Sequence, residues 1–112
     1  MVSAFPSVRR LVRDIRPDVV HAHYLTSYGF AATFCGYRPT IVTAWGTDLL
    51  LMPLRSRLYD RIVRTVLKRA DYVTVPAPHM KKFIAARGYT CKESIATIPV
   101  GVDDAFFSLS TF

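Results

Sequence analysis

The chain has 112 residues, enough for one domain with its own hydrophobic core and too few for two. Hydrophobic residues make up 51% of it, and 15 lysines and arginines outnumber 8 aspartates and glutamates, for a formal net charge of +7. This composition excludes a wholly disordered chain and favours anionic partners. Neither a membrane-spanning run nor an apolar signal-peptide core is found in the sequence, so we expect a cytoplasmic protein.

Helical and extended segments alternate along the chain. Apolar residues recur at helical spacing over residues 7–16 and 55–70, and small residues precede a glycine over residues 26–36, so helices are expected there. A fourth helix is expected to begin at residues 76–78 and to end at Gly88. Short β-branched or apolar runs between them predict strands over residues 19–24, 40–45, 72–75 and 95–100. Residues 46–53 are expected to form a turn and a loop.

This alternation predicts an α/β fold, a Rossmann-like doubly wound parallel sheet of about four strands with helices on both faces. Sheets of this kind bind ligands beyond the carboxyl ends of their strands. Polar and special residues gather there: His21, His23 and Tyr24 after the first strand, then Trp45, Gly46, Thr47 and Asp48 after the second. No glycine-rich phosphate-binding motif is present, so a nucleotide is not expected to bind through such a motif.

His21 and His23 stand two residues apart on one predicted strand, so their side chains share a face and could bind a metal together. This would suit a metal-dependent hydrolase. The candidate carboxylate ligands are scattered, however, so we expect no metal and assign the histidines to hydrogen bonding within the sheet or to a ligand.

Four basic residues line one side of the predicted helix over 55–70, at steps of four, three and four: Arg57, Arg61, Arg64 and Lys68. They form either a solvated helix face or a contact with an anionic membrane surface or an acidic partner. The aromatic residues of this helix lie on its apolar side, so specific nucleic-acid binding is not expected.

Four motifs in order resemble family 4 glycosyltransferases, in their N-terminal domain: RPDVVHAHY (16–24), IVTAWGTD (41–48), LKRADYVT (67–74) and IPVGVD (98–103). The resemblance implies a GT-B architecture of two Rossmann-like domains and a retaining, metal-independent transfer from a nucleotide sugar. It places residues 1–104 in the acceptor-side domain and residues 105–112 at the start of a linker, with Gly101, Val102 and Asp103 at the interdomain hinge.

The family's glycine-rich first loop and its paired donor-binding glutamates have no counterpart here, since Glu93 is the only glutamate. The chain is therefore expected to be a fragment that binds no cofactor itself and is inactive without the second domain, which would hold the nucleotide sugar. Its other expected partner is a sugar acceptor, either a glycan or a lipid-linked molecule.

The resemblance assigns Asp48 and His23 as the polar or catalytic residues, Gly46 and Thr47 to close backbone approach, and Trp45 to an apolar wall, with His21 and Tyr24 also binding substrate. The structural alternative is that residues 46–48 form a tight strand-to-loop turn in which Asp48 accepts hydrogen bonds from local amides. Many family members have histidine where Trp45 stands, and indole cannot titrate. The alternative function is a non-catalytic basic module at an anionic membrane or acidic partner. We also expect peripheral attachment to the inner membrane face and a homo-oligomer that forms through an exposed sheet edge.

Overall fold

The computed structural model describes residues 5–101 and 103–107. Four parallel strands form one sheet in the order β1-β2-β3-β4: β1 (Val20–His23), β2 (Thr40–Thr43), β3 (Tyr72–Val75) and β4 (Ala96–Thr97). The register aligns His23 with Thr43, and Thr43 with Thr74, so the carboxyl ends of the first three strands meet at one edge. The predicted α/β class with a parallel sheet of four strands is confirmed.

The helices connect these strands in sequence order. The chain begins with α1 (Phe5–Ile15), and the longest connection, between β2 and β3, contains α3 (Thr47–Leu50), α4 (Met52–Arg55) and α5 (Arg57–Arg69). A π-helical turn, η2 (Leu25–Gly29), and α2 (Phe30–Thr33) connect β1 to β2. α6 (Pro78–Ala86) connects β3 to β4, and α7 (Asp104–Phe107) follows β4.

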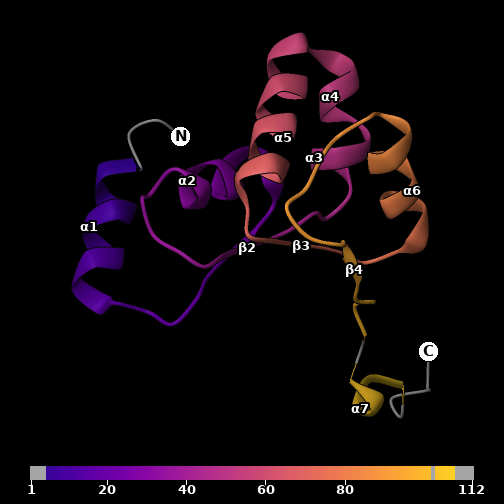
Figure 1. Cartoon of the computed structure of the whole chain (residues 1–112). Coiled ribbons are helices and arrows are strands. Elements are labelled where there is room, and N and C mark those ends of the chain that lie inside the picture. The colour runs from indigo at the N-terminus through magenta and orange to yellow at the C-terminus, as the bar shows by residue number, and fades with distance from the viewer. Residues whose placement is uncertain (1–4, 102, 108–112) are drawn as a thin grey trace.

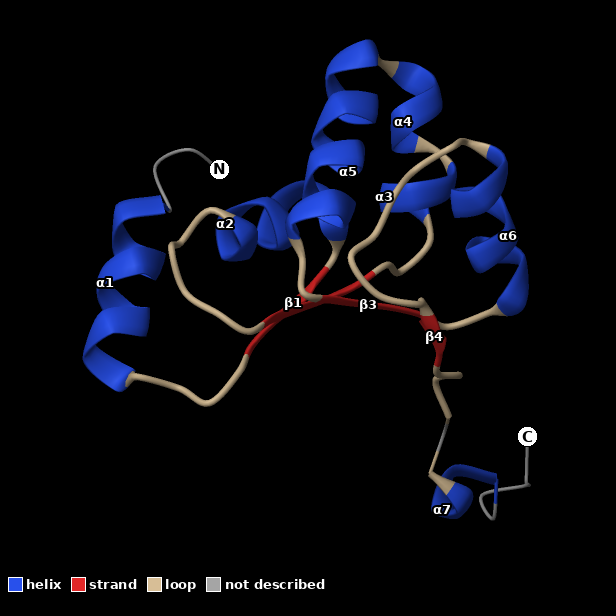
Figure 2. Cartoon of the chain, in the orientation of Figure 1, coloured by secondary structure: helices blue, strands red, loops and turns tan. Residues whose placement is uncertain are grey.

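The helices that connect the strands all lie on one face of the sheet (Figure 1). Each strand is added on the same side of the one before it, and right-handed crossovers then place every connection on the same face. We expected helices on both faces of the sheet, but in the described residues the connecting helices cover only one face. Figure 2 shows α7 at the end of an extended segment that leads away from the sheet.

The core lies between the sheet and these helices. Side chains from the inner face of the strands pack there against η2, α3, α5 and α6, and the most buried include Leu25, Val42, Leu49, Val66 and Ile84. Gly29 allows η2 to approach α5 closely, because a Cβ at this position would lie 3.0 Å from the Tyr24 carbonyl oxygen and 3.2 Å from Val66 Cγ1.

Alternate strand residues face away from the core. In β1 Ala22 is buried, whereas His21 and His23 are exposed. In β3 Val73 and Val75 are buried, whereas Tyr72 is exposed and Thr74 half-buried. Because strand side chains alternate between faces, the histidines and these residues share the outer face of the sheet.

Candidate functional site

The turn after β2 is built around the carboxylate of Asp48, which is fully buried at the first turn of α3. Its Oδ1 accepts hydrogen bonds from the backbone amides of Gly46 at 2.8 Å and Trp45 at 3.0 Å. Its Oδ2 accepts one from the backbone amide of Leu25 at 2.7 Å. One side chain therefore joins the segment after β2 to the segment after β1.

Gly46 takes a backbone conformation that other residues rarely adopt, with φ at 151°. A Cβ added there would meet no atom within 4 Å. Glycine is therefore required by the turn itself and not by crowding, and the space beside it is open to a ligand. Thr47, the next residue, is exposed at the start of α3.

The side chains of Trp45 and His23 meet above this turn. The indole Nε1 of Trp45 donates a hydrogen bond to Nδ1 of His23 at 3.2 Å, and the two ring centroids lie 5.6 Å apart. An imidazole that accepts at Nδ1 carries its proton on Nε2 when it is neutral. His23 therefore presents a donor at Nε2, and Trp45 leaves 45% of its surface exposed.

A second polar row crosses the same face of the sheet. Nε2 of His21 lies 2.8 Å from Oγ1 of Thr43, which lies 2.6 Å from Oγ1 of Thr74. The rings of His21 and His23 are 4.2 Å apart between centroids. Partial burial lowers the pKa of His21, and the neighbouring His23 lowers it further, so the neutral form of His21 is favoured.

The two histidines border a cavity of about 430 Å³ at the outer edge of β1. His21 and His23 are its polar lining, and the rest is mostly apolar: Val8, Val20, Ala22, Tyr28, Ala31 and Ala32. A mostly apolar cavity with a few convergent polar groups is the usual form of a small-molecule site.

The structure thus brings together most of the residues expected after β1 and β2. His21, His23 and Trp45 form one cluster, and Gly46 and Asp48 form the turn that supports it. Tyr24 directly follows β1, with φ at 90°, and is half-buried. The catalytic role assigned to Asp48 stays a prediction. Its carboxylate is buried and accepts hydrogen bonds from backbone amides, an arrangement that supports the turn.

The expected hinge lies apart from this cluster. Gly101 is exposed after β4, Asp103 accepts a hydrogen bond from the backbone amide of Ala105 at 2.9 Å, and Val102 lies outside the described residues. Residues 108–112 of the expected linker also lie outside them. Among the described residues, no group of three or more histidine, cysteine, aspartate or glutamate side chains is placed to hold a metal ion.

Sequence reasoning missed the contacts of Thr43 and Thr74. Both are threonines on strands that were correctly predicted, but only the register of β2 and β3 shows that their hydroxyls meet. The alternation of strand side chains could have indicated that Thr43 shares a face with the histidines once β1 and β2 were paired.

A parallel α/β sheet with a polar cluster at the carboxyl ends of neighbouring strands is the arrangement of a Rossmann-like domain. A family model described as a glycosyl transferase 4-like domain matches residues 1–101 of the chain. The chain therefore belongs to the glycosyl transferase 4-like domain family, and the predicted resemblance is confirmed. A comparison with curated proteins gives no match.

Proposed function

We propose that this domain binds the sugar acceptor of a retaining glycosyltransferase, while a second domain binds the nucleotide sugar. The observation that carries the proposal is the family match together with the paired His23 and Trp45 side chains at the carboxyl ends of β1 and β2. The family makes the chain a glycosyltransferase domain, and the cluster is where a ligand would bind in such a sheet.

In the proposed reaction, the acceptor oxygen forms a bond to the anomeric carbon as the bond from that carbon to the nucleotide phosphate breaks. The acceptor hydroxyl loses its proton to the departing phosphate, and the transition state resembles an oxocarbenium ion. Closure of the two domains would exclude water and align the reactants. A GT-B arrangement would supply that closure.

Within this scheme His23 orients the acceptor through its Nε2 proton. Nδ1, the nitrogen that could take up a proton, accepts the hydrogen bond from Trp45, so the geometry favours His23 as a donor over a general base. Trp45 provides an apolar wall, against which a sugar face can stack. Asp48 acts as a positioning residue because it holds the backbone on which Trp45 and Gly46 stand.

The test is the stereochemistry of transfer by the enzyme that combines this chain with its donor-binding domain. A panel of nucleotide sugars is incubated with candidate glycan and lipid-linked acceptors, and the anomeric configuration of the product is determined by NMR. The proposal expects a product with the anomeric configuration of the donor. An inverted product would contradict retention, and no transfer to any acceptor would contradict the assignment of an acceptor site.

A second candidate function, membrane or acidic-partner contact, is favoured by the surface at the α4–α5 tip (Figure 1). Three leucines are exposed there: Leu51 by 39%, Leu54 by 59% and Leu58 by 64%. Arg57 and Arg61 are exposed on the same helical segment. Exposed apolar side chains next to arginines are typical of surfaces that lie in a lipid interface.

This contact is compatible with transfer to a lipid-linked acceptor at the inner face of a membrane. No helix among the described residues is long and apolar enough to span a bilayer. Co-sedimentation with anionic vesicles tests the contact. Binding should fall with rising salt and should be lost when Leu54 and Leu58 are replaced by serine. Vesicle binding that changes with neither salt nor these substitutions would contradict the proposed contact.

A further inference from the structure

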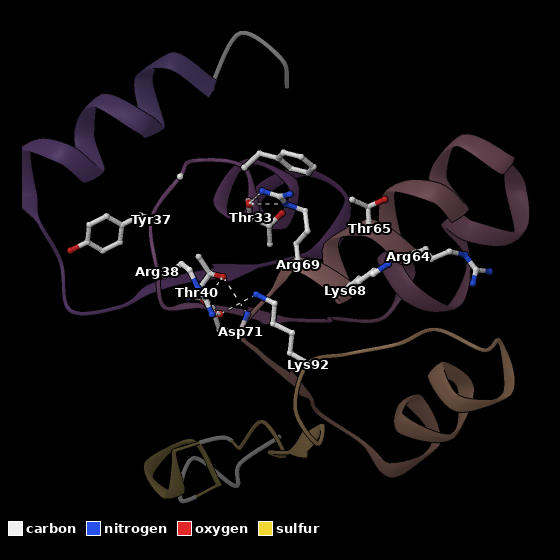
Figure 3. A pocket seen from close by; sticks show the side chains of 12 residues that line it. Thr33, Tyr37, Arg38, Thr40, Arg64, Thr65, Lys68, Arg69, Asp71 and Lys92 are labelled. Carbon is white, nitrogen blue, oxygen red and sulfur yellow. Dashed lines mark hydrogen bonds and ion pairs between the residues drawn. The ribbon is translucent and has the colours of Figure 1, made fainter.

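A larger cavity of about 790 Å³ lies at the opposite end of the strands from the candidate acceptor site (Figure 3). It is bordered by Thr40, the first residue of β2, by Asp71, directly before β3, and by the last turns of α5. A strand residue advances about 3.3 Å, so the four residues of β2 separate the two regions by roughly 10 Å.

The lining of this cavity is strongly cationic. It includes a single carboxylate, that of Asp71, and five basic side chains: Arg38, Arg64, Lys68, Arg69 and Lys92. The formal charge excess is four. These side chains come from three segments far apart in the sequence, the loop before β2, the C-terminal half of α5, and the loop after α6. The fold therefore concentrates positive charge here beyond what one helix face provides.

Asp71 fixes two of the cations without neutralising both. Its Oδ1 accepts from Nη2 of Arg38 at 2.6 Å and from Nζ of Lys92 at 3.3 Å, and its Oδ2 accepts from the backbone amide of Thr40 at 2.8 Å. The hydrogen bond from Arg38 is the main reason that the pKa of Asp71 lies well below its usual range. One permanent negative charge is therefore shared between two positive ones.

Arg69 is held in place by neutral groups instead. Its Nε and Nη2 donate to the carbonyl oxygen of Thr33 at 3.1 and 3.0 Å, and its guanidinium lies 4.0 Å from the centroid of the Phe34 ring. These contacts use two of its five N–H donors, and no carboxylate among the described residues pairs with its charge. A guanidinium held in this way loses little conformational entropy when it binds an oxyanion.

Lys68 adds a further charge. In the part of the chain that the structure describes, no carboxylate lies within ion-pair distance of its ammonium group. Arg64 is different, because it pairs with Asp60 at 3.5 Å and lies over the Tyr89 ring. Figure 3 shows the Arg64 side chain pointing away from the centre of the cavity. Without Arg64, the cations that line the cavity are Arg38, Lys68, Arg69 and Lys92, and their formal excess over Asp71 is three.

We propose that this cationic pocket binds a ligand through a phosphate monoester or diphosphate group. Such groups carry two or more negative charges and several acceptor oxygens, which match guanidinium and ammonium donors. The volume exceeds that of a phosphate alone and suits a phosphorylated small molecule or a phospholipid headgroup. The proposal goes beyond the acceptor site, since the pocket lies at the other end of the sheet.

Isothermal titration of the full chain with inorganic pyrophosphate at fixed ionic strength tests the pocket. The Lys68→Gln/Lys92→Gln variant removes two charges from the cavity. The matched control, Lys81→Gln/Lys82→Gln, removes two exposed lysine charges from α6 residues that do not line it. Far-UV circular dichroism and urea midpoints verify that the variants fold. If the double pocket variant does not fold, the single variant Lys68→Gln replaces it in the titration.

The proposal expects the pocket variant to raise the dissociation constant for pyrophosphate by about tenfold or more, and the control by about threefold at most. Equal weakening by the two variants would show a non-specific field of the basic surface and would overturn the proposal. So would the absence of pyrophosphate binding to the unaltered chain. None of these readouts depends on sugar transfer.

Vesicles distinguish the two sources of the phosphate group. Co-sedimentation compares vesicles that contain phosphatidic acid, a phosphate monoester, with phosphatidylserine vesicles of equal surface charge. If the pocket variant loses its preference for phosphatidic acid together with pyrophosphate binding, the ligand is a lipid headgroup. If it loses pyrophosphate binding and sediments with both vesicles as before, the ligand is a soluble phosphate compound. Both outcomes support the pocket.

Discussion

Replacement of Asp48 by alanine should destabilise the domain strongly, because three backbone amides lose their only described acceptor at this carboxylate. A hydrogen bond to an ionised group contributes about 1.5–3 kcal/mol. Removal of the carboxylate also removes the cost of burying it away from water, which offsets part of the free energy lost with the three hydrogen bonds. A buried donor left without an acceptor typically costs about 1–3 kcal/mol, so for three amides we expect Asp48→Ala to cost about 3–5 kcal/mol in total.

Urea unfolding followed by circular dichroism measures the effect. With a slope of about 1–3 kcal/mol per molar urea, the expected loss lowers the midpoint by about 2 M. Trp45 is the only tryptophan of the chain, so its fluorescence reports separately on the turn after β2. Asp18→Ala removes an exposed aspartate and serves as the control. If Asp48→Ala stayed within about 0.5 kcal/mol of the unaltered chain, as exposed substitutions do, the positioning role would be refuted.

Three further predictions concern backbone strain and acid stability. Gly46→Ala should cost about 1–3 kcal/mol of unfolding free energy through its positive φ alone, whereas Gly101→Ala should change little; equal effects in urea unfolding would contradict this. The hydrogen bond from Arg38 lowers the pKa of Asp71, so the stability that this carboxylate contributes is present above about pH 3.9 and is lost as the pH falls through the lower folded-state pKa. Unfolding at pH 5 and pH 3 should show a smaller acid loss for Asp71→Asn than for the unaltered chain, and equal losses would disprove it. Burial lowers the pKa of His21, so stability should decline as the pH falls below about 6.5. His21→Gln should flatten that decline, and an equal decline in the variant would contradict the prediction.

The strands and long helices could be predicted from local patterns. The β-branched run at 40–43 and the apolar spacing over 57–69 lie inside the ranges expected from the sequence. The fourth strand was predicted too long, over 95–100, and only Ala96 and Thr97 form it. β3 ends at Val75, and Pro99 has no N–H with which to continue a ladder.

The segment after β2 was harder to predict. Residues 46–53 were expected to form a turn and loop, but α3 and the start of α4 lie there. Helices of four residues are too short to show an apolar period, and Pro53 suggests a break although it occupies the first turn of α4. The π-helical turn at 25–29 overlaps the start of the helix predicted over 26–36, and it likewise has no sequence signature.

The candidate site could be predicted in its members but not in its contacts. The order of the strands brings the ends of β1 and β2 together, which is why His23 and Trp45 were expected near each other. The hydrogen bond from Trp45 to His23, and the burial of Asp48 beneath them, depend on side-chain directions that only the tertiary structure sets. Helices on both faces were expected because parallel strands need crossovers and are usually buried on both sides, but helices cover both faces only where the strand order reverses, and the order β1-β2-β3-β4 has no reversal.

The central claim is that the acceptor binds at His23, and a comparison of two histidine variants tests it most directly. His23→Ala and His79→Ala each remove one exposed imidazole, but only His23 belongs to the site cluster, since His79 lies at the start of α6. In the enzyme that includes the donor-binding domain, sugar transfer is measured as kcat/KM for the acceptor. We expect His23→Ala to lower kcat/KM by about 10²-fold, as the loss of an orienting contact can, and His79→Ala to leave it unchanged. Equal values for the two variants would contradict the account.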